Sequence, residues 1–233
     1  MSTRIVGQIS LQEGFLEAQA HSIVDALCAA AASTPEVAQS HAGVNSPGSV
    51  GGGEITFDLD FESDADCARL LAKSDPGAGL GLLAGLGVEH AALQGAIDGV
   101  DAVVVEPLDA QVGVPGLIGM KRTLLLRVEE EATPEQRADF ERDMLAMAAY
   151  VPAIRNWSFG RVRQTDPCPG PSRWTHVWEQ EFETADGLLG DYMASPYHWG
   201  YIDSWYDPEN PRRVVDPWLA HVFCPATQSV LCW

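Results

Sequence analysis

The stretch FDLDFES, residues 57–63, has a counterpart in WEQEFET, residues 178–184. Both consist of an aromatic residue, an acid, any residue, an acid, Phe, Glu and a hydroxyl residue. Upstream of each stretch, PEVAQSHAG (35–43) and PAIRNWSFG (152–160) share a Pro, a β-branched residue two positions on and a Gly eight positions on. An internal repeat determines the architecture of a whole chain, because each copy is one structural unit. The matches therefore predict two copies of one unit.

The segments that flank these stretches extend the repeat. Strand-like TRIVGQIS and KRTLLLRV begin the two copies, and VVVEP and HVFCP close them. The periodicity predicts the same order in each copy: strand, long helix, strand, strand, helix with an irregular continuation, strand. This order predicts an α+β fold. The first unit is expected at 1–110, a linker at 111–119 and the second unit at 120–233.

The long helix of the second unit has a clear beginning and end. Residues 133–136 form a capping box with Pro134 at the first helical position. Pro152 follows the last apolar position, where a proline cannot continue a helix. Between them the apolar residues recur at helical spacing at Phe140, Met144, Met147 and Val151.

Charge and composition exclude several classes of partner. The chain has 233 residues and a net charge of -19. This charge repels phosphate backbones and anionic lipid heads, so neither nucleic acid nor a membrane is expected as a partner. No apolar leader or span is visible, and we expect a cytoplasmic protein. We expect reduced thiols and no metal site, because no CxxC pair occurs among the five cysteines, Cys28, Cys67, Cys168, Cys224 and Cys232.

The two copies differ in their chemistry. All tryptophans and tyrosines lie after residue 140. In the first copy, the strand at 55–61 alternates apolar and polar residues, which is typical of one apolar face. In the second copy, His176 and Gln180 interrupt that face. Burying an unpaired polar group costs roughly 1–3 kcal/mol, so the change indicates a functional site in the second copy. The alternative is a hydrogen-bonded core histidine and a glutamine at a strand end.

The aromatic segment DYMASPYHWGYIDSWYD, residues 191–207, contains the candidate chemistry. Pro196 disfavours a helical conformation at Ser195, so the chain is expected to turn and bring His198 back toward Tyr192. A neutral histidine can accept a proton near pH 7, and a tyrosine hydroxyl can donate to a carbonyl oxygen that gains charge. The pair is suited to forming an enolate. The alternative is that the aromatic residues only pack this segment onto the sheet, as is also expected of His221 on the last strand.

Three motifs carry a family resemblance: WTHVWEQEF (174–182), DYMASPYHWGY (191–201) and VVDPWLAHVF (214–223). In order and spacing, residues 120–226 resemble the stress-responsive dimeric α/β-barrel (Dabb) proteins, which are ferredoxin-like. Residues 3–110 look like a diverged second copy. Members of this family usually pair two chains. The resemblance therefore implies two ferredoxin-like units in tandem, whose sheets pack into one pseudo-dimeric barrel within the chain.

The resemblance also implies an activity. A plant polyketide cyclase of this family performs an intramolecular aldol condensation without metal or organic cofactor, and its catalytic tyrosine and histidine fall on Tyr192 and His198. A further pocket histidine falls on His176. The cyclase has two more histidines where this chain has Arg122 and Ser195. One active site per chain is implied, because the first copy has Leu71 and Ala78 where the catalytic pair would be.

Three residues are predicted to bind the substrate. His176 is a polar contact, and Trp178 follows it on the same strand face. Arg122 either binds a substrate carboxylate or pairs with one of the chain's many acids.

The prediction is therefore a cofactor-free acid/base enzyme. A cyclase, lyase or isomerase would act through an enolate on a carbonyl-containing aromatic or polyketide-like small molecule. Three alternatives stay open: a non-catalytic stress or ligand-binding protein, a cofactor-free monooxygenase, and a barrel that binds haem through His198. A homodimer of the two-unit chain is a further expectation.

Overall fold

The structure, a computed structural model, describes residues 3–74, 80–88, 95–163, 174–229 and 231. No helix in these ranges is long and apolar enough to cross a membrane. The first half contains β1 (Thr3–Leu11), α1 (Glu17–Ser33), β2 (Gln39–Val44), β3 (Ile55–Phe61), α2 (Asp64–Lys73), α3 (Gly81–Gly85) and β4 (Ile97–Val112). The second half contains β5 (Gly119–Leu126), α5 (Pro134–Tyr150), β6 (Asn156–Arg163), β7 (His176–Phe182), η1 (Gly187–Tyr192), η2 (His198–Ile202), η3 (Asp203–Trp205) and β8 (Ala220–Ala226). The α+β class predicted from the sequence is confirmed.

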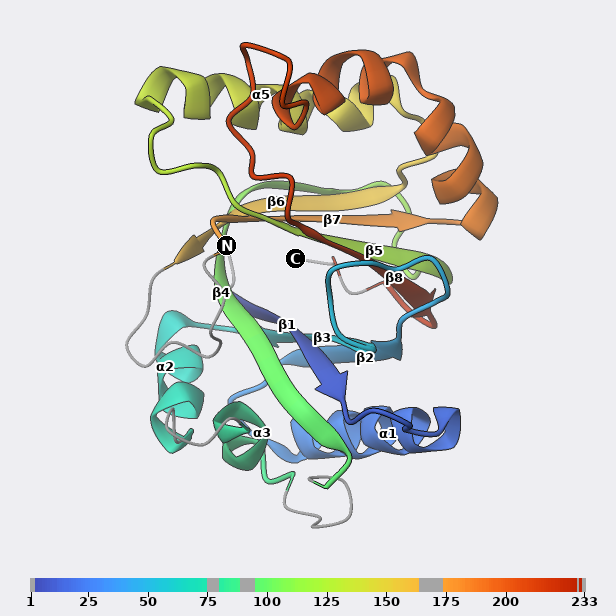
Figure 1. Cartoon of the computed structure of the whole chain (residues 1–233). Coiled ribbons are helices and arrows are strands. Elements are labelled where there is room, and N and C mark those ends of the chain that lie inside the picture. The colour runs from blue at the N-terminus through green and yellow to red at the C-terminus, as the bar shows by residue number, and fades with distance from the viewer. Residues whose placement is uncertain (1–2, 75–79, 89–94, 164–173, 230, 232–233) are drawn as a thin grey trace.

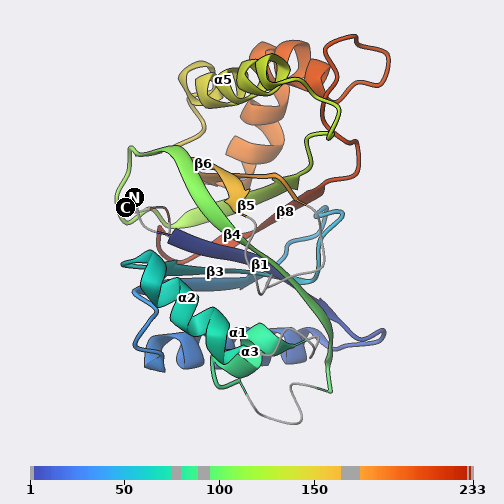
Figure 2. The same ribbon diagram turned by 90° about the vertical axis from the view of Figure 1, so that its left-hand side faces the viewer.

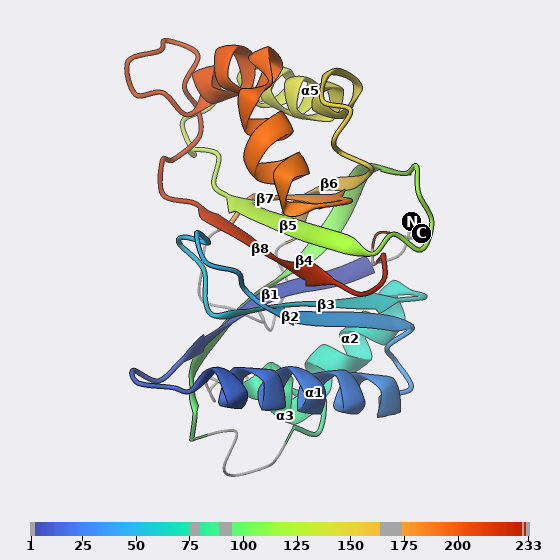
Figure 3. The ribbon, with the colours of Figure 1, turned by 90° about the vertical axis from the view of Figure 1, so that its right-hand side faces the viewer.

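All strands belong to one antiparallel sheet in the order β2-β3-β1-β4-β6-β7-β5-β8. Each half contributes four neighbouring strands, and β4 pairs with β6 where the halves meet. The two ends of the sheet approach each other, because the backbones of Val50 and His221 exchange hydrogen bonds of 2.9 and 2.8 Å. The sheet therefore forms a nearly closed barrel, with the strands of the two halves facing each other (Figures 1 and 3).

The helices cover the outer faces of this barrel. Figure 2 shows α1, α2 and α3 on the first-half strands and α5 on the opposite side. In the first half, Phe57 and Leu59 of β3 share a buried core with Leu27 of α1. In the second half, Phe140 and Met144 of α5 share another buried core with β5 and β7. Each core therefore lies between one half's strands and its own helices.

The capping box predicted for the long helix of the second half is confirmed. The Thr133 hydroxyl accepts a hydrogen bond from the Gln136 backbone, and the Gln136 side chain accepts one from the Thr133 backbone. These bonds satisfy amide groups that a helix start leaves without intrahelical partners, and Pro134 lacks such a group. They fix the beginning of α5 above the second-half sheet.

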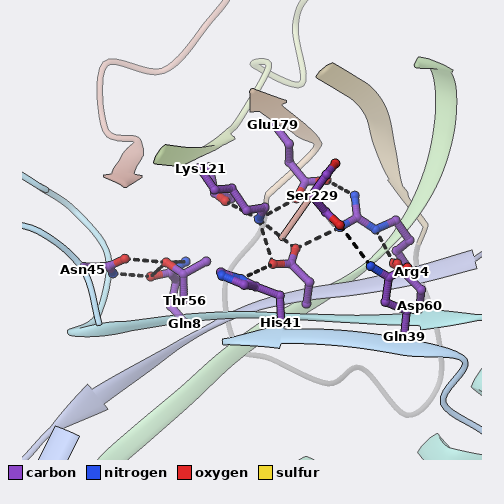
Figure 4. Close-up of polar contacts among 12 residues, drawn as sticks. Arg4, Gln8, Gln39, His41, Asn45, Thr56, Asp60, Lys121, Glu179 and Ser229 are labelled. Carbon is purple, nitrogen blue, oxygen red and sulfur yellow. Dashed lines mark hydrogen bonds and ion pairs between the residues drawn. The ribbon is translucent and has the colours of Figure 1, made fainter. Parts of the chain in front are cut away.

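The inner face of the barrel is also buried and contains ions. All seven residues of β3 are buried, so its polar face is covered as well. Lys121 Nζ lies 2.8 Å from Asp58 Oδ2 and 2.8 Å from Glu179 Oε1. Arg4 pairs with Asp58, Asp60 and Glu179. We call Arg4, Asp58, Asp60, Lys121 and Glu179 the inter-half ion cluster. Figure 4 shows Arg4, Asp60, Lys121 and Glu179 of this cluster between the two sets of strands.

The border between the halves lies in regular structure. β4 continues to Val112, where Gln111 and Val112 pair with Trp157 and Asn156 of β6. Of the linker expected at 111–119, Gly119 therefore belongs to β5, and two further residues, Gln111 and Val112, belong to β4. Gln111 and Val112 are strand residues because they pair with β6 of the other half. This pairing exists only in the folded structure, so the local sequence did not indicate it.

Candidate active site

A cavity of about 270 Å³ lies on the helix-covered side of the second-half sheet, between β5, β8 and the segments that follow β7. Its lining is mainly apolar, and a few polar groups converge on it. All lining residues except Val50 come from the second half. They are Val50, Arg122, Leu124, Met144, Met147, Tyr192, Met193, His198, Ile202, Asp203, Tyr206, Leu219 and His221.

Tyr192 and His198 meet in this cavity through an interrupted helix. Tyr192 is the last residue of the π-helical segment η1, and His198 is the first residue of the π-helical segment η2. The helix stops at Ser195, directly before Pro196, as expected for a residue that precedes proline. The two ring centroids lie 4.4 Å apart. Single π-helical turns are rare and often occur at functional sites.

Arg122 of β5 positions the Tyr192 hydroxyl. Its Nη1 donates to the Tyr192 oxygen at 3.1 Å and to Gln180 Oε1. Its guanidinium carbon lies 5.0 Å from the centroid of the Tyr192 ring. Burial raises the pKa of Tyr192, and the nearby Arg122 cation only partly opposes this shift. Tyr192 is therefore a neutral hydroxyl at physiological pH.

His198 is in a state in which it can accept a proton. The residue is buried, and its Nε2 lies 3.7 Å from Asp203 Oδ1. Burial lowers the pKa of His198, and Asp203 opposes this shift while Arg122 adds to it. Burial disfavours the charged form of a histidine. The imidazole is therefore neutral near pH 7.

Two further polar residues, neither of which was predicted as a site residue from the sequence, line the cavity. The hydroxyl of Tyr206 and Nε2 of His221 are buried and have no hydrogen-bond partner among the described residues. Burial lowers the pKa of His221 to about 3, with further contributions from Arg122 and His198. A buried polar atom without a partner is unusual in a native protein and requires an explanation, such as a water or a ligand.

The pairing of β5 with β8 contains the signal that could have identified His221 as a cavity residue. His221 lies opposite Leu124, and Phe223 lies opposite Arg122. Residues opposite each other in an antiparallel pair share one face of the sheet. His221 therefore shares the face of Arg122, which the alternation along the last strand would have indicated once the two strands were paired. The segment around Tyr206 is irregular and offers no such signal.

His176 does not line the cavity, although the sequence predicted a pocket contact. Among the described residues, its Nδ1 contacts the Thr175 hydroxyl at 2.8 Å and its Nε2 contacts Glu141 Oε1 at 3.0 Å. Its ring stacks on Phe159 at 5.5 Å. Burial raises the pKa of Glu141, but hydrogen bonds from His176 and Arg161 outweigh burial and bring it to about 2. His176 is therefore a hydrogen-bonded core histidine, the alternative interpretation of the sequence.

Trp178 also lies outside the cavity, although the sequence predicted a ligand contact. It is fully buried and packs against Trp157 and Phe159. β7 pairs with β6 on one side and β5 on the other, whereas the cavity lies above β5 and β8. Trp178 therefore does not line this cavity, and its predicted contact with a ligand stays a prediction. In the described ranges, no group of three or more His, Cys, Asp and Glu side chains is arranged to hold a metal ion.

Comparison with known proteins identifies a family resemblance in one segment of the chain. Residues 120–218 match the model of the Stress responsive A/B Barrel Domain, Dabb. The resemblance to the Dabb family is thereby confirmed for this segment. Over 87 residues, the chain is 26% identical to olivetolic acid cyclase from Cannabis sativa, an alignment that covers 37% of this chain and 82% of the cyclase.

Solved structures extend the likeness beyond the Dabb segment. The structure of an anthrone oxidase-like protein has a TM-score of 0.60 and 12% identity, and the match covers 96% of this chain and 90% of that chain. A presumed monooxygenase from Fusobacterium nucleatum subsp. nucleatum has a TM-score of 0.58 and 10% identity, with 99% of this chain and 93% of that chain covered. At these identities the matches show the fold alone. That shared fold includes both halves of the chain.

Proposed function

We propose that this chain is a cofactor-free acid/base enzyme, a cyclase, lyase or isomerase. Its substrate would be a carbonyl-containing aromatic or polyketide-like small molecule that reacts through an enolate. The observation that carries the proposal is the contact between Tyr192 and His198, whose ring centroids lie 4.4 Å apart in one cavity. The 26% identity to olivetolic acid cyclase over 87 residues supports it.

In the proposed reaction, His198 acts as the base. Its neutral imidazole takes a proton from a carbon next to the substrate carbonyl. Negative charge then develops on the carbonyl oxygen, to which the Tyr192 hydroxyl donates a hydrogen bond. The Arg122 cation, 3.1 Å from the same hydroxyl, stabilises this charge through Tyr192. In a cyclase, the enolate carbon then attacks a second carbonyl carbon of the substrate, and the imidazolium gives its proton to the oxygen of that carbonyl. In a lyase, the enolate expels a leaving group that takes the proton, and in an isomerase the proton returns to another carbon of the enolate.

The protonation states of both residues suit these roles. Burial lowers the pKa of His198, so a base is available at neutral pH. Burial raises the pKa of Tyr192, so its proton is retained until charge develops on the substrate. General acid–base catalysis of this kind contributes roughly 10²- to 10⁴-fold in rate. Hydrogen-bond donors that are held in place before reaction stabilise an oxyanion at little further cost.

We also propose that the halves are diverged tandem copies, with one site per chain. The proposed units are residues 1–110 and 120–233, joined by the linker 111–119. In support, the strand orders of the two halves, β2-β3-β1-β4 and β6-β7-β5-β8, follow the same internal pattern. In the first half, Leu71 is buried in an apolar core. No counterpart of the Tyr192–His198 pair is therefore expected there.

Proton exchange tests the proposed function without knowledge of the natural substrate. Aryl ketones and aryl 1,3-diketones would be incubated with the protein in D₂O, and deuterium uptake next to the carbonyl would be followed by NMR. The wild-type chain should accelerate uptake for at least one member, and His198→Ala should lose this acceleration. Uptake that is equal in wild type and His198→Ala would count against the proposal.

A ligand-binding protein without catalysis is the second candidate, favoured by the apolar residues that line most of the cavity. It predicts stoichiometric binding with no deuterium uptake. A cofactor-free monooxygenase would form the same enolate and then consume oxygen, which an oxygen electrode detects. A barrel that binds haem through His198 predicts the absorption band of haem in the spectrum of the purified protein.

A further inference from the structure

Arg122 is a buried cation without a carboxylate partner among the described residues. Its side chain lies in the floor of the cavity and the residue is only 5% exposed. Its hydrogen-bond partners, Gln180 and Tyr192, are both neutral. The other buried cations of the barrel differ, because Lys121 contacts two carboxylates and Arg4 contacts three. The sequence left open whether Arg122 pairs with an acid, and no such acid lies in the described ranges.

The cavity offers no compensating anion of its own. Asp203 is the one carboxylate among the described lining residues. Its side chain is half exposed and lies 3.7 Å from His198, and no ion pair joins it to Arg122. Burying an unpaired charge is among the costliest arrangements in a protein, and buried charges are normally paired. A bound anion would remove this cost.

We infer that the cavity binds an organic carboxylate with an apolar body, and that the carboxylate group pairs with Arg122. This inference rests on the proposed function only in using the same cavity. A guanidinium group presents several donors in a plane that matches the two oxygens of a carboxylate. A ligand containing such a group would supply the anion that the fold omits.

Unpartnered atoms around Arg122 support a polar ligand group at this place. Nε of Arg122, the hydroxyl of Tyr206 and Nε2 of His221 are all buried without a partner among the described residues. All three residues line the cavity. The hydroxyl and the imidazole can each donate a hydrogen bond to a carboxylate oxygen, depending for the imidazole on its tautomer. The polar end of the ligand is therefore expected between β5, β8 and Tyr206.

The rest of the cavity defines the body of the ligand. Aliphatic and methionine side chains form much of its wall, at Val50, Leu124, Met144, Met147, Met193, Ile202 and Leu219. The volume of about 270 Å³ is just below the usual range of about 300–1,000 Å³ for ligand pockets. A single ring with a short apolar substituent suits this space. His198 and Tyr192 would then face atoms close to the carboxylate end.

Calorimetric titration with two probes of equal shape tests the inference: 4-ethylbenzoate, which is anionic, and 4-ethylbenzamide, which is neutral. The wild-type chain should bind the benzoate about 10- to 100-fold more tightly, the range expected for a hydrogen bond to a charged group. Equal affinities, or no binding of the benzoate up to its solubility limit, would overturn the inference. This comparison uses the natural chain and does not depend on the folding of a variant.

Variants then assign the preference to Arg122. Arg122→Gln should bind both probes equally, and Arg122→Lys should retain part of the preference because it retains the charge. Arg127→Gln is the matched control, because Arg127 directly follows β5, is half exposed and pairs with Asp216. It should behave as wild type. A full preference for the benzoate in Arg122→Gln would refute the assignment.

The same titration, combined with the deuterium-uptake assay, separates this inference from the proposed function. His198→Ala removes the proposed base but leaves Arg122 in place. It should lose deuterium uptake and keep the preference for benzoate. If the wild-type chain prefers the benzoate but catalyses no exchange, the carboxylate site stands and the enzymatic proposal fails. If exchange depends on His198 while both probes bind equally, the enzymatic proposal stands and the carboxylate site fails.

Discussion

Lys121 of the second half and Asp58 of the first half form an ion pair, with 2.8 Å between Nζ and Oδ2 and at most 1% of either side chain exposed. The pair joins β5 to β3, which are not neighbours in the sheet order. A buried ion pair adds little net stability relative to an apolar pair, but removing one partner leaves an uncompensated charge. The inner face of each half is therefore suited to the other half.

Lys121→Met should destabilise the chain strongly, because both Asp58 and Glu179 lose a cation in a buried place. Breaking a buried pair in this way typically costs about 3–5 kcal/mol. The free energy of unfolding in urea measures this cost. Arg142→Met is the control, since 64% of its side chain and 42% of that of its partner Asp139 are exposed, and exposed pairs contribute about 0–1 kcal/mol. Equal losses in the two variants would show that the inter-half ion cluster does not matter for stability.

Glu179 should make stability depend on pH. The inter-half ion cluster holds three carboxylates against two cations, and His41 lies 3.5 Å from Asp58. Burial raises the pKa of Glu179 to about 7, above its value of 4.5 in an unfolded chain. The folded state therefore binds the proton more tightly than the unfolded state, so the contribution of Glu179 is fully present below about pH 4.5 and is lost as pH rises through 7.

The free energy of unfolding, measured from pH 5 to 8, tests this prediction against Glu179→Gln. The wild-type value should fall with pH by at most about 1.4 kcal/mol per pH unit relative to the variant. The pKa of Asp58 is shifted in the opposite direction, so its loss of stability occurs at lower pH and does not enter this window. If the free energy of unfolding depended on pH in the same way in wild type and Glu179→Gln, Glu179 would be charged over the whole range from pH 5 to 8, which would contradict the prediction.

The fragment 120–233, expressed alone, should dimerise or aggregate. Its inner face would expose Leu125 and Val177, which the first half covers with Val6 and Val103 in the intact chain. Size-exclusion chromatography with light scattering gives the mass of the fragment. A monomer that unfolds cooperatively would contradict the proposed pairing of the two halves within the chain.

The sequence predicted the order of elements in each half because apolar alternation and helix caps are local signals. The capping box at Thr133 and the break before Pro196 are such signals, and both features lie where the residues placed them. The alternation also identified the polar face of β3. It could not show that Lys121, from another strand of the other half, covers Asp58, because that contact joins residues far apart in the chain.

Only the part of the candidate site that depends on residues close together in the chain was predicted from the sequence. Tyr192 and His198 are close in sequence, so a turn was enough to bring them together. His176 was assigned to the correct face of its strand, but its distance from the cavity depends on the order of strands. The role of His221 depends on a missing hydrogen-bond partner, a property of the folded structure alone.

His176→Ala should affect stability rather than catalysis. The change removes the hydrogen bond to Glu141 and the stacking on Phe159. Leaving a buried acceptor without its partner costs about 1–3 kcal/mol. Thermal unfolding should show this loss, while the rate of deuterium uptake at a temperature where the variant is folded should stay within a few-fold of wild type. A large loss of rate in a stably folded variant would return His176 to the site.

The most direct test of the acid/base account compares deuterium uptake by wild type, His198→Ala and Tyr192→Phe, together with their melting temperatures. The account predicts a roughly 10²- to 10⁴-fold lower rate in His198→Ala and a smaller loss in Tyr192→Phe, with both variants folded. The wild-type rate should rise with pH through a midpoint below the ordinary 6.5 of histidine, because burial lowers the pKa of His198 and only the neutral ring accepts a proton. A near-normal rate in His198→Ala would contradict the account.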